Sequence, residues 1–209
     1  MNKLLVAVSL FAFGAAYAQS GTSKGPAPSG KTAAPAASGG TAAPAGGMEM
    51  TPPKPGPEQA AIKPLVQSAS GTGEHMMPDG KAMPSKAKST CKWLPGNMWA
   101  ACDIDETVGT GKTAMKWQGH MVFGYDTAAK AYRAYMTDSW GMSDRMKGTL
   151  DGTKMVWESM DEMKVPNMPS KTRVTEDFTE AKTDKLTFEG MMNGKWVPMG
   201  TMTMKAGGK

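Results

Sequence analysis

The chain has 209 residues, with 24 Lys and Arg against 19 Asp and Glu and a formal net charge of +5, which suits one ordinary domain with attached segments. This charge is too small and too mixed for a dedicated nucleic-acid-binding protein, and no apolar run beyond the N-terminus is long enough to span a membrane. Methionine is the unusual residue, with 21 copies, because average domains are dominated by Leu, Ala, Gly, Ser and Val.

The first 18 residues have the pattern of a secretory signal peptide. Lys3 supplies the positive charge, residues 4–16 are apolar, and Ala16-Tyr17-Ala18 is a small-x-small cleavage site. We therefore expect cleavage after Ala18 and a periplasmic or secreted protein. Residues 19–57 are rich in Ala, Gly and Pro and are predicted to form a disordered linker.

The folded domain is expected over residues 58–205, with a flexible tail at 206–209. It opens with one short helix from Glu58 to Val66, because Pro57 precedes the segment and Ile62 and Val66 are four residues apart. Pro64 limits the length of that helix.

A cystine hairpin follows. Cys91 and Cys102 are the only cysteines, and a hairpin centred on Gly96-Asn97 places them directly opposite each other, within disulfide range. We therefore predict a Cys91–Cys102 disulfide between strands 85–94 and 99–108. Because Pro95 lacks an N–H, a four-residue loop closed by Leu94 and Trp99 is expected.

Alternating apolar and polar residues predict the remaining strands. These strands cover residues 113–125, 131–140, 146–150, 153–159, 172–179, 186–192 and 195–205. Asp151-Gly152 and Asn193-Gly194 are typical of two-residue type I′ hairpin turns. The fold class is thus all-β, with eight to ten antiparallel strands. A single meander of this size closes into an up-and-down barrel, which removes exposed edges; a two-sheet sandwich is the alternative.

Several short motifs then suggest a family. They are Pro53-Lys54-Pro55-Gly56-Pro57-Glu58, Trp117-x-Gly119-His120-Met121-Val122-x-Gly124-Tyr125-Asp126, Lys130-x-Tyr132-Arg133-Ala134, Asp138-Ser139-x-Gly141, Lys147-Gly148-x-Leu150-Asp151-Gly152 and Lys171-x-Arg173-x-Thr175. In this order and spacing the chain resembles the bacterial family called domain of unknown function 1579, whose members are often exported. The resemblance implies a calycin-like, lipocalin-type β-barrel and brings no catalytic residues. Relatives usually place Gly-(Ser/Thr)-Trp at the start of the first strand, whereas residues 67–71 here lack the Trp, so packing at that end of the barrel is expected to differ.

The ionisable residues form no recognisable catalytic motif. Asp103 and Asp105 share one strand face and Glu106 does not, and these carboxylates are expected to be solvated rather than to form an acid/base pair. His120 is expected to point outward with Lys116 and Gln118. In the reverse orientation His120 would enter the lumen and could ligate haem, as a histidine does in the calycin-like nitrobindins.

The methionines have three interpretations. Those on strand faces with aromatic residues are predicted to fill the core: Met115, Met121, Met136, Met155, Met202 and Met204. Loop clusters suit Cu(I), a soft cation that binds thioethers. The candidates are Met48 and Met50; His75, Met76, Met77 and Met83; and Met160, Met163 and Met168. Exposed methionines would alternatively serve as a reversible oxidant sink.

The leading functional prediction is a non-enzymatic, exported barrel that binds a small apolar or amphipathic ligand without a cofactor. Its predicted lining is Trp117, Tyr125, Tyr132, Trp140, Trp157 and Arg173. This prediction requires a cavity of about 300 Å³ or more. The alternatives are a Met-rich Cu(I)-binding envelope protein and a structural or interaction module on the flexible linker.

Overall fold

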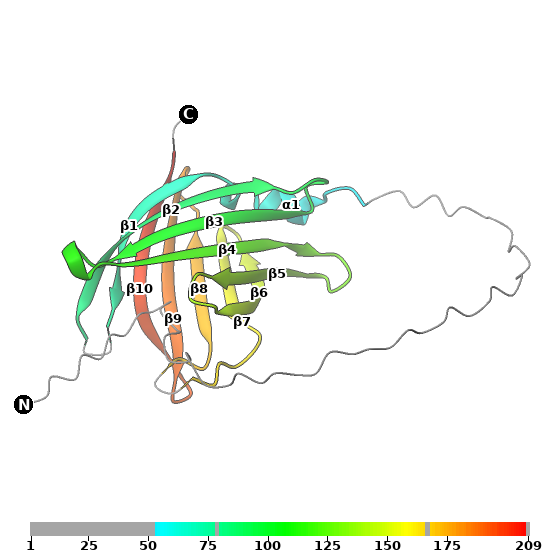
Figure 1. Cartoon of the computed structure of the whole chain (residues 1–209). Helices are drawn as coiled ribbons and strands as arrows, with labels where there is room; N and C mark the ends of the chain where they lie inside the picture. Colours follow the sequence, from blue (N-terminus) through cyan, green and yellow to red (C-terminus); the bar gives the residue numbers. More distant parts are fainter. Residues whose placement is uncertain (1–52, 78–79, 166–167, 208–209) are drawn as a thin grey trace, which may run out of the picture. The chain divides into compact units, whose positions relative to one another are not determined.

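Within residues 53–77, 80–165 and 168–207, which the computed structural model describes, ten antiparallel strands form one closed barrel (Figure 1). The strands follow one another around the barrel as a meander, and the first strand pairs with both the second and the last. The predicted up-and-down barrel is therefore confirmed, and the sandwich alternative is wrong. The strands are β1 (Ala69–Met76), β2 (Ala82–Trp93), β3 (Trp99–Val108), β4 (Met115–Asp126), β5 (Ala131–Asp138), β6 (Ser143–Asp151), β7 (Lys154–Ser159), β8 (Thr172–Asp177), β9 (Thr183–Met192) and β10 (Lys195–Ala206).

Two short helical turns stand before the barrel in place of the single helix predicted over 58–66. They are α1 (Pro57–Ala61) and the 3₁₀ helix η1 (Lys63–Leu65). A second 3₁₀ turn, η2 (Gly111–Thr113), joins β3 to β4. Pro64 has no N–H to continue an α-helical hydrogen-bond ladder, so the helix breaks before it. Ile62, between the two turns, is fully buried in the core of the barrel. None of the helices in the described part of the chain has the length and hydrophobicity that a membrane crossing requires.

The cystine hairpin has the predicted geometry. Cys91 and Cys102 occupy paired positions of β2 and β3 and are joined by a disulfide. The N–H of Leu94 donates to the carbonyl oxygen of Trp99 at 2.8 Å, which closes the expected four-residue loop.

The two glycine turns behave differently from each other. Asn193 and Gly194 both have positive φ angles between the paired residues Met192 and Lys195, as the predicted type I′ turn requires. At the other turn Asp151 pairs with Lys154, so the loop residues are Gly152 and Thr153 rather than Asp151 and Gly152. The prediction was wrong by one residue there because Gly152 takes the first central position, the place that a type II′ turn reserves for glycine.

Strand β1 had no counterpart among the predicted ranges. Its inward positions include Gly71 and Gly73, which carry no side chain and so give no apolar alternation. A Cβ on Gly73 would collide with the carbonyl oxygen of Thr201 on β10. The seam that closes the barrel thus depends on a backbone approach that only glycine permits.

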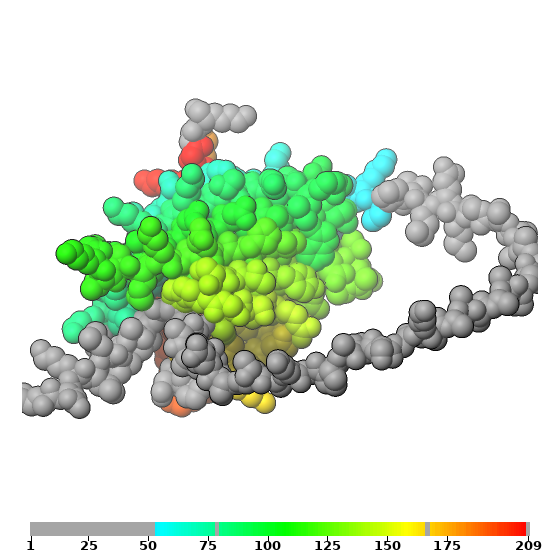
Figure 2. All heavy atoms as spheres, viewed as in Figure 1, coloured from blue at the N-terminus to red at the C-terminus, as the bar shows by residue number. Residues whose placement is uncertain are grey.

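One face of each strand supplies the interior, and the space-filling view shows the green and yellow strands as a continuous wall (Figure 2). The buried apolar side chains are Ile62, Ala87, Ala100, Ala101, Cys102, Trp117, Phe123, Ala134, Met146, Met155, Trp157, Phe188, Met202 and Met204. Met155, Met202 and Met204 are among them, which confirms the core prediction for these three methionines. The other three methionines of that prediction, Met115, Met121 and Met136, are half-buried.

Candidate functional site

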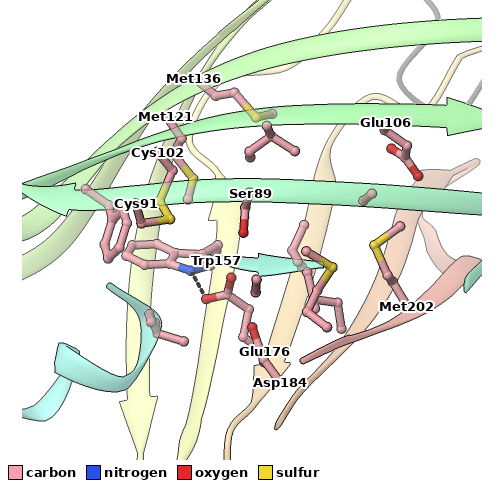
Figure 3. Close-up of a pocket in the computed structure, with 18 of the residues that line it drawn as sticks. Ser89, Cys91, Cys102, Glu106, Met121, Met136, Trp157, Glu176, Asp184 and Met202 are labelled. Atoms are coloured by element: carbon pink, nitrogen blue, oxygen red, sulfur yellow. Dashed lines mark hydrogen bonds between the residues drawn. A yellow bond between two sulfur atoms is a disulfide. The ribbon is translucent and has the colours of Figure 1, made fainter. Parts of the chain in front are cut away.

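A small cavity remains inside the barrel, and its volume is about 140 Å³. Residues Pro64 and Leu65 of η1 contribute to its wall, together with inward side chains from the strands (Figure 3). Gln67 and Ala69 also line it. Both belong to residues 67–71, which lack the Trp of the family and for which different packing was predicted. The expected lumen of about 300 Å³ or more is wrong, because large side chains fill most of the interior.

Aromatic and sulfur-containing side chains form the apolar wall. The rings of Phe123 and Trp157 pack edge to face, with centroids 6.0 Å apart. Trp117, Met121 and Met136 line the cavity beside them. A wall of this kind favours a compact apolar group, since each of these side chains presents polarisable surface without a competing charge.

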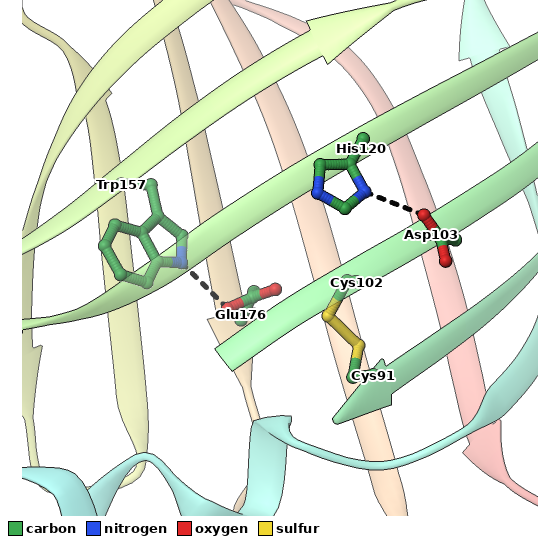
Figure 4. The surroundings of a disulfide bond; sticks show 6 residues. All are labelled: Cys91, Cys102, Asp103, His120, Trp157 and Glu176. Atoms are coloured by element: carbon green, nitrogen blue, oxygen red, sulfur yellow. Dashed lines mark hydrogen bonds and ion pairs between the residues drawn. A yellow bond between two sulfur atoms is a disulfide. The ribbon is translucent and has the colours of Figure 1, made fainter. Parts of the chain in front are cut away.

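The disulfide also belongs to the cavity wall. Cys102 is almost completely buried and Cys91 packs against the same core cluster. Asp103, which follows Cys102 in the chain, points the opposite way, to the outer surface (Figure 4). The disulfide therefore ties β2 to β3 on the lumen side.

Two carboxylates, Glu176 of β8 and Asp184 of β9, enter the cavity from one side (Figure 3). The indole Nε1–H of Trp157 donates to Oε2 of Glu176 at 2.9 Å. Burial and the neighbouring Asp184 raise the pKa of Glu176 to about 8. Burial, with a smaller contribution from Asp177, raises the pKa of Asp184 to about 7. At neutral pH this pair therefore holds bound protons.

A third carboxylate, Glu106, lines another part of the cavity. Its Oε1 lies 2.7 Å from Nε2 of His75 and accepts a hydrogen bond from Ser85 Oγ at 2.6 Å. His75 and Glu106 are both buried. The prediction of a solvated face holds for Asp103 and Asp105 but is wrong for Glu106, because the alternation of β3 turns its even-numbered residues inward.

Of the six predicted lining residues, Trp117 and Trp157 line the cavity and the other four do not. Tyr125 and Tyr132 pack against each other with centroids 5.1 Å apart, and the Tyr132 hydroxyl donates to the carbonyl oxygen of Glu58 in α1. Trp140 lies in the turn between β5 and β6, where its backbone N–H donates to Oδ1 of Asp138.

Arg173 lies on the outer face of β8. Its guanidinium makes two hydrogen bonds of 2.8 Å to the carboxylate of Glu189 and stacks 4.3 Å from the ring centroid of Trp196. Its placement in the lumen was wrong because Arg173 alternates with Val174, which faces the cavity.

The residues of the copper hypothesis are divided between different environments. Met48 and Met50 lie outside the described residues. His75 is inside the barrel with its Nε2 against Glu106, whereas Met76, Met77 and Met83 belong to the ends of β1 and β2 and their connection. In the segment after β7, Sδ of Met160 accepts a hydrogen bond from Arg133 Nη1 at 3.1 Å, and a guanidinium is an unfavourable neighbour for a bound cation.

Met163 and Met168 continue that segment, and copper binding there stays a prediction. The described residues contain no group of three or more His, Cys, Asp and Glu side chains that could hold a metal ion.

His120 points outward, as predicted, and its Nδ1 lies 2.7 Å from Oδ1 of Asp103 (Figure 4). The two side chains are 52% and 73% exposed. The orientation that the haem alternative required is therefore wrong.

Sequence reasoning missed the three acidic residues of the cavity, although a signal for one of them was present. Glu176 shares the parity of Val174 and Phe178, the two residues that marked one face of its strand. Charged residues on an apolar face are rarely buried without a partner. Its place on the apolar face of the strand therefore marks Glu176 as a candidate functional residue.

Comparison with known proteins supports the family and the fold. The family model described as "Protein of unknown function (DUF1579)" matches residues 54–206. No curated protein matches the sequence. Among solved structures, the chain is similar to that titled "Crystal Structure of Rv2717c from M. tuberculosis", with a TM-score of 0.53 and 8% identity. The match covers 73% of this chain and 99% of the other, and at this identity it concerns the fold alone.

Proposed function

Because this chain belongs to the DUF1579 family, whose function is unknown, we propose that it is an exported, non-enzymatic barrel protein that binds one small ligand with an apolar body. The observation that carries the proposal is the cavity of about 140 Å³ beside Trp117, Phe123 and Trp157. An engineered apolar cavity of roughly 150 Å³ binds benzene. The cavity is smaller than the roughly 300 Å³ that the sequence-based prediction required, so the proposal is narrowed to a ligand of single-ring or short-chain size.

Polar groups at the wall make an amphipathic ligand the better fit. Ser89, Glu106 and Glu176 line the cavity together with the apolar side chains. Ligand sites commonly combine an apolar lining with a few polar groups that fix the orientation of the ligand.

The Cys91–Cys102 disulfide supports the proposal of export. Disulfides form and persist in oxidising compartments and are rare in the cytosol of mesophiles. The predicted signal peptide, residues 1–18, lies outside the described residues and remains a prediction.

Toluene is a suitable probe of the apolar site. We expect its addition to shift the indole N–H resonances of Trp117 and Trp157 in a two-dimensional NMR spectrum, with saturation. Ala69→Leu places extra volume in the cavity and should abolish the shifts, whereas Ser70→Leu adds a leucine at the adjacent, exposed position and should leave them. Unchanged indole resonances in the wild-type protein at saturating toluene would contradict the proposed function.

A further inference from the structure

The ionisable side chains that line the cavity are all acidic. Glu106, Glu176 and Asp184 line it, and no Lys or Arg is among the described residues that form its lining. This contrasts with the whole chain, whose formal net charge is +5. The His75 ring, which is not part of the lining, contacts Glu106 with its Nε2 2.7 Å from Oε1. A ligand that enters the cavity therefore meets acidic groups and no lysine or arginine of the described lining.

Glu176 and Asp184 are positioned as a pair. Leu186 is the register partner of Glu176, so Asp184 is its diagonal neighbour on the same inward face. Trp157 supplies a donor to Oε2 of Glu176. Oδ1 of Asp184 is buried and accepts no hydrogen bond from the residues that the structure describes. A buried carboxylate oxygen without a donor is costly, and a ligand donor would relieve that cost.

We propose that the ligand of this cavity is a small organic amine, with its ammonium group between Glu176 and Asp184 and its apolar body against Trp157 and Phe123. The proposal rests on the proposed function, since it names the chemical class of the same ligand. An ammonium carries several N–H donors, which suits a site where Oδ1 of Asp184 has no donor among the described residues.

A metal ion fits the same place less well. Hard cations need six or more oxygen ligands, and the described residues contain no acidic or histidine group of three that could hold one. Met202, Met204 and Phe188 occupy the wall near the acidic pair. These apolar side chains contact an organic body favourably but do nothing for a hydrated metal ion.

The binding of an amine depends on the protonation of the acidic pair. The ionisable groups around it are Glu176 and Asp177 on β8, Asp184 on β9 and Glu106 across the cavity on β3. Asp177 is on the outer side of β8, 3.6 Å from Lys154 Nζ. From β7, β10 and β2 the neighbours are Trp157, Met202, Met204, Ala87 and Ser89, which carry no charge. An amine thus competes with protons for the pair, and its affinity should rise as the pH rises.

The test uses full-length protein and three probes of similar shape: benzylamine, benzyl alcohol and toluene. We expect benzylamine to bind at least ten times more tightly than either neutral probe at about pH 8.5, by calorimetry and by the Trp157 indole shift. Its affinity should fall at least tenfold between about pH 8.5 and pH 6, whereas that of toluene should not change. These measurements need no variant, so they hold even if a substitution impairs folding.

Variants then locate the ammonium group. Glu176→Gln and Asp184→Asn keep the shape of the side chains and should each weaken benzylamine at least fivefold without weakening toluene. Glu158→Gln removes the same charge from an exposed position next to Trp157 and should have no effect. If toluene or benzyl alcohol binds as tightly as benzylamine, the amine proposal is wrong and the proposed function stands; if none of the three binds, the proposed function itself is wrong. Equal losses in Glu176→Gln and Glu158→Gln would also overturn the amine proposal, because they would indicate a general effect of charge.

Discussion

Trp157 donates its indole N–H to Glu176 across 2.9 Å inside the barrel. The two residues lie on neighbouring strands, with Val174 as the register partner of Trp157. The same tryptophan is almost completely buried and packs edge to face on Phe123. Trp157 therefore both shapes the apolar wall of the cavity and orients the carboxyl group of Glu176.

The acidic pair predicts how stability varies with pH. In the unfolded chain both acids titrate near pH 4, whereas in the fold the pKa of Glu176 is about 8 and that of Asp184 is about 7. Between about pH 4 and pH 8 the native state therefore binds more protons than the unfolded state. The favourable contribution is therefore complete below about pH 4 and is lost as the pH rises through 7 and 8.

We expect the free energy of unfolding to fall by several kcal/mol between about pH 5 and pH 8.5, as the two carboxyl groups ionise in the native state. Urea denaturation at several pH values measures it. Glu176→Gln, which cannot ionise, should flatten the fall, whereas the exposed Glu158→Gln should retain it. Parallel curves for wild type and Glu176→Gln would show that Glu176 is ionised in the native state at no cost.

Reduction of the Cys91–Cys102 disulfide should destabilise the barrel. The two residues are 11 positions apart, and closing a short loop contributes about 2–3 kcal/mol through the entropy of the unfolded chain. Chemical denaturation with and without a reductant measures the loss. The double variant Cys91→Ala/Cys102→Ala should be insensitive to the reductant, and any remaining effect in it would point to another cause.

The two histidines should differ strongly when each is replaced by alanine. His75→Ala removes a fully buried ring that contacts Phe188 and the Glu106 carboxylate, so we expect a loss of about 2–4 kcal/mol. His120→Ala removes an exposed ion pair and should change the unfolding free energy by less than about 0.5 kcal/mol. Equal losses would mean that the assigned faces of β1 or β4 are incorrect.

The seam between β1 and β10 should be sensitive to a single methyl group. Gly73→Ala introduces a Cβ that meets the Thr201 carbonyl oxygen and the Met202 backbone, so we expect a loss of at least about 2 kcal/mol. Thr72→Ala, at the adjacent exposed position, should cost much less. Thermal unfolding followed by circular dichroism compares the two, and similar melting temperatures would contradict the close approach.

Much of the barrel was predictable because its strands carry strong local signals. The residues from Trp99 to Val108 were assigned with the observed bounds, since a four-residue turn and a paired cysteine fix the register on one side. Strand β1 escaped prediction because Gly71 and Gly73 replace the inward side chains on which alternation depends. At Gly152 the dipeptide alone did not distinguish a type I′ turn from a type II′ turn, and the choice moved the loop by one residue.

The site was less predictable than the fold. A residue lines the cavity only if its side chain points inward and if it also lies at the level of the cavity along its strand. Trp117 and Trp157 were correctly placed on inward faces, but Tyr125 and Tyr132 lie near α1, beyond the cavity. Arg173 was predicted to line the cavity, but it alternates with the inward-facing Val174 and so lies on the outer face of β8. Asp184 was not recognised because the predicted strand began at Leu186, which placed Asp184 in the preceding turn. In the structure β9 begins at Thr183 and includes Asp184.

The pairing of β1 with β10 also constrains the order of events during folding. Ala69 and Ala206 are partners across this seam, near the two ends of the folded segment, whereas Cys91 and Cys102 are only 11 positions apart in the chain. Local contacts form earlier than contacts that require a long loop to close. A nascent chain can therefore form the β2–β3 hairpin while its last strand is still being synthesised, and the open edges of β1 and β10 stay vulnerable to aggregation until the final residues arrive.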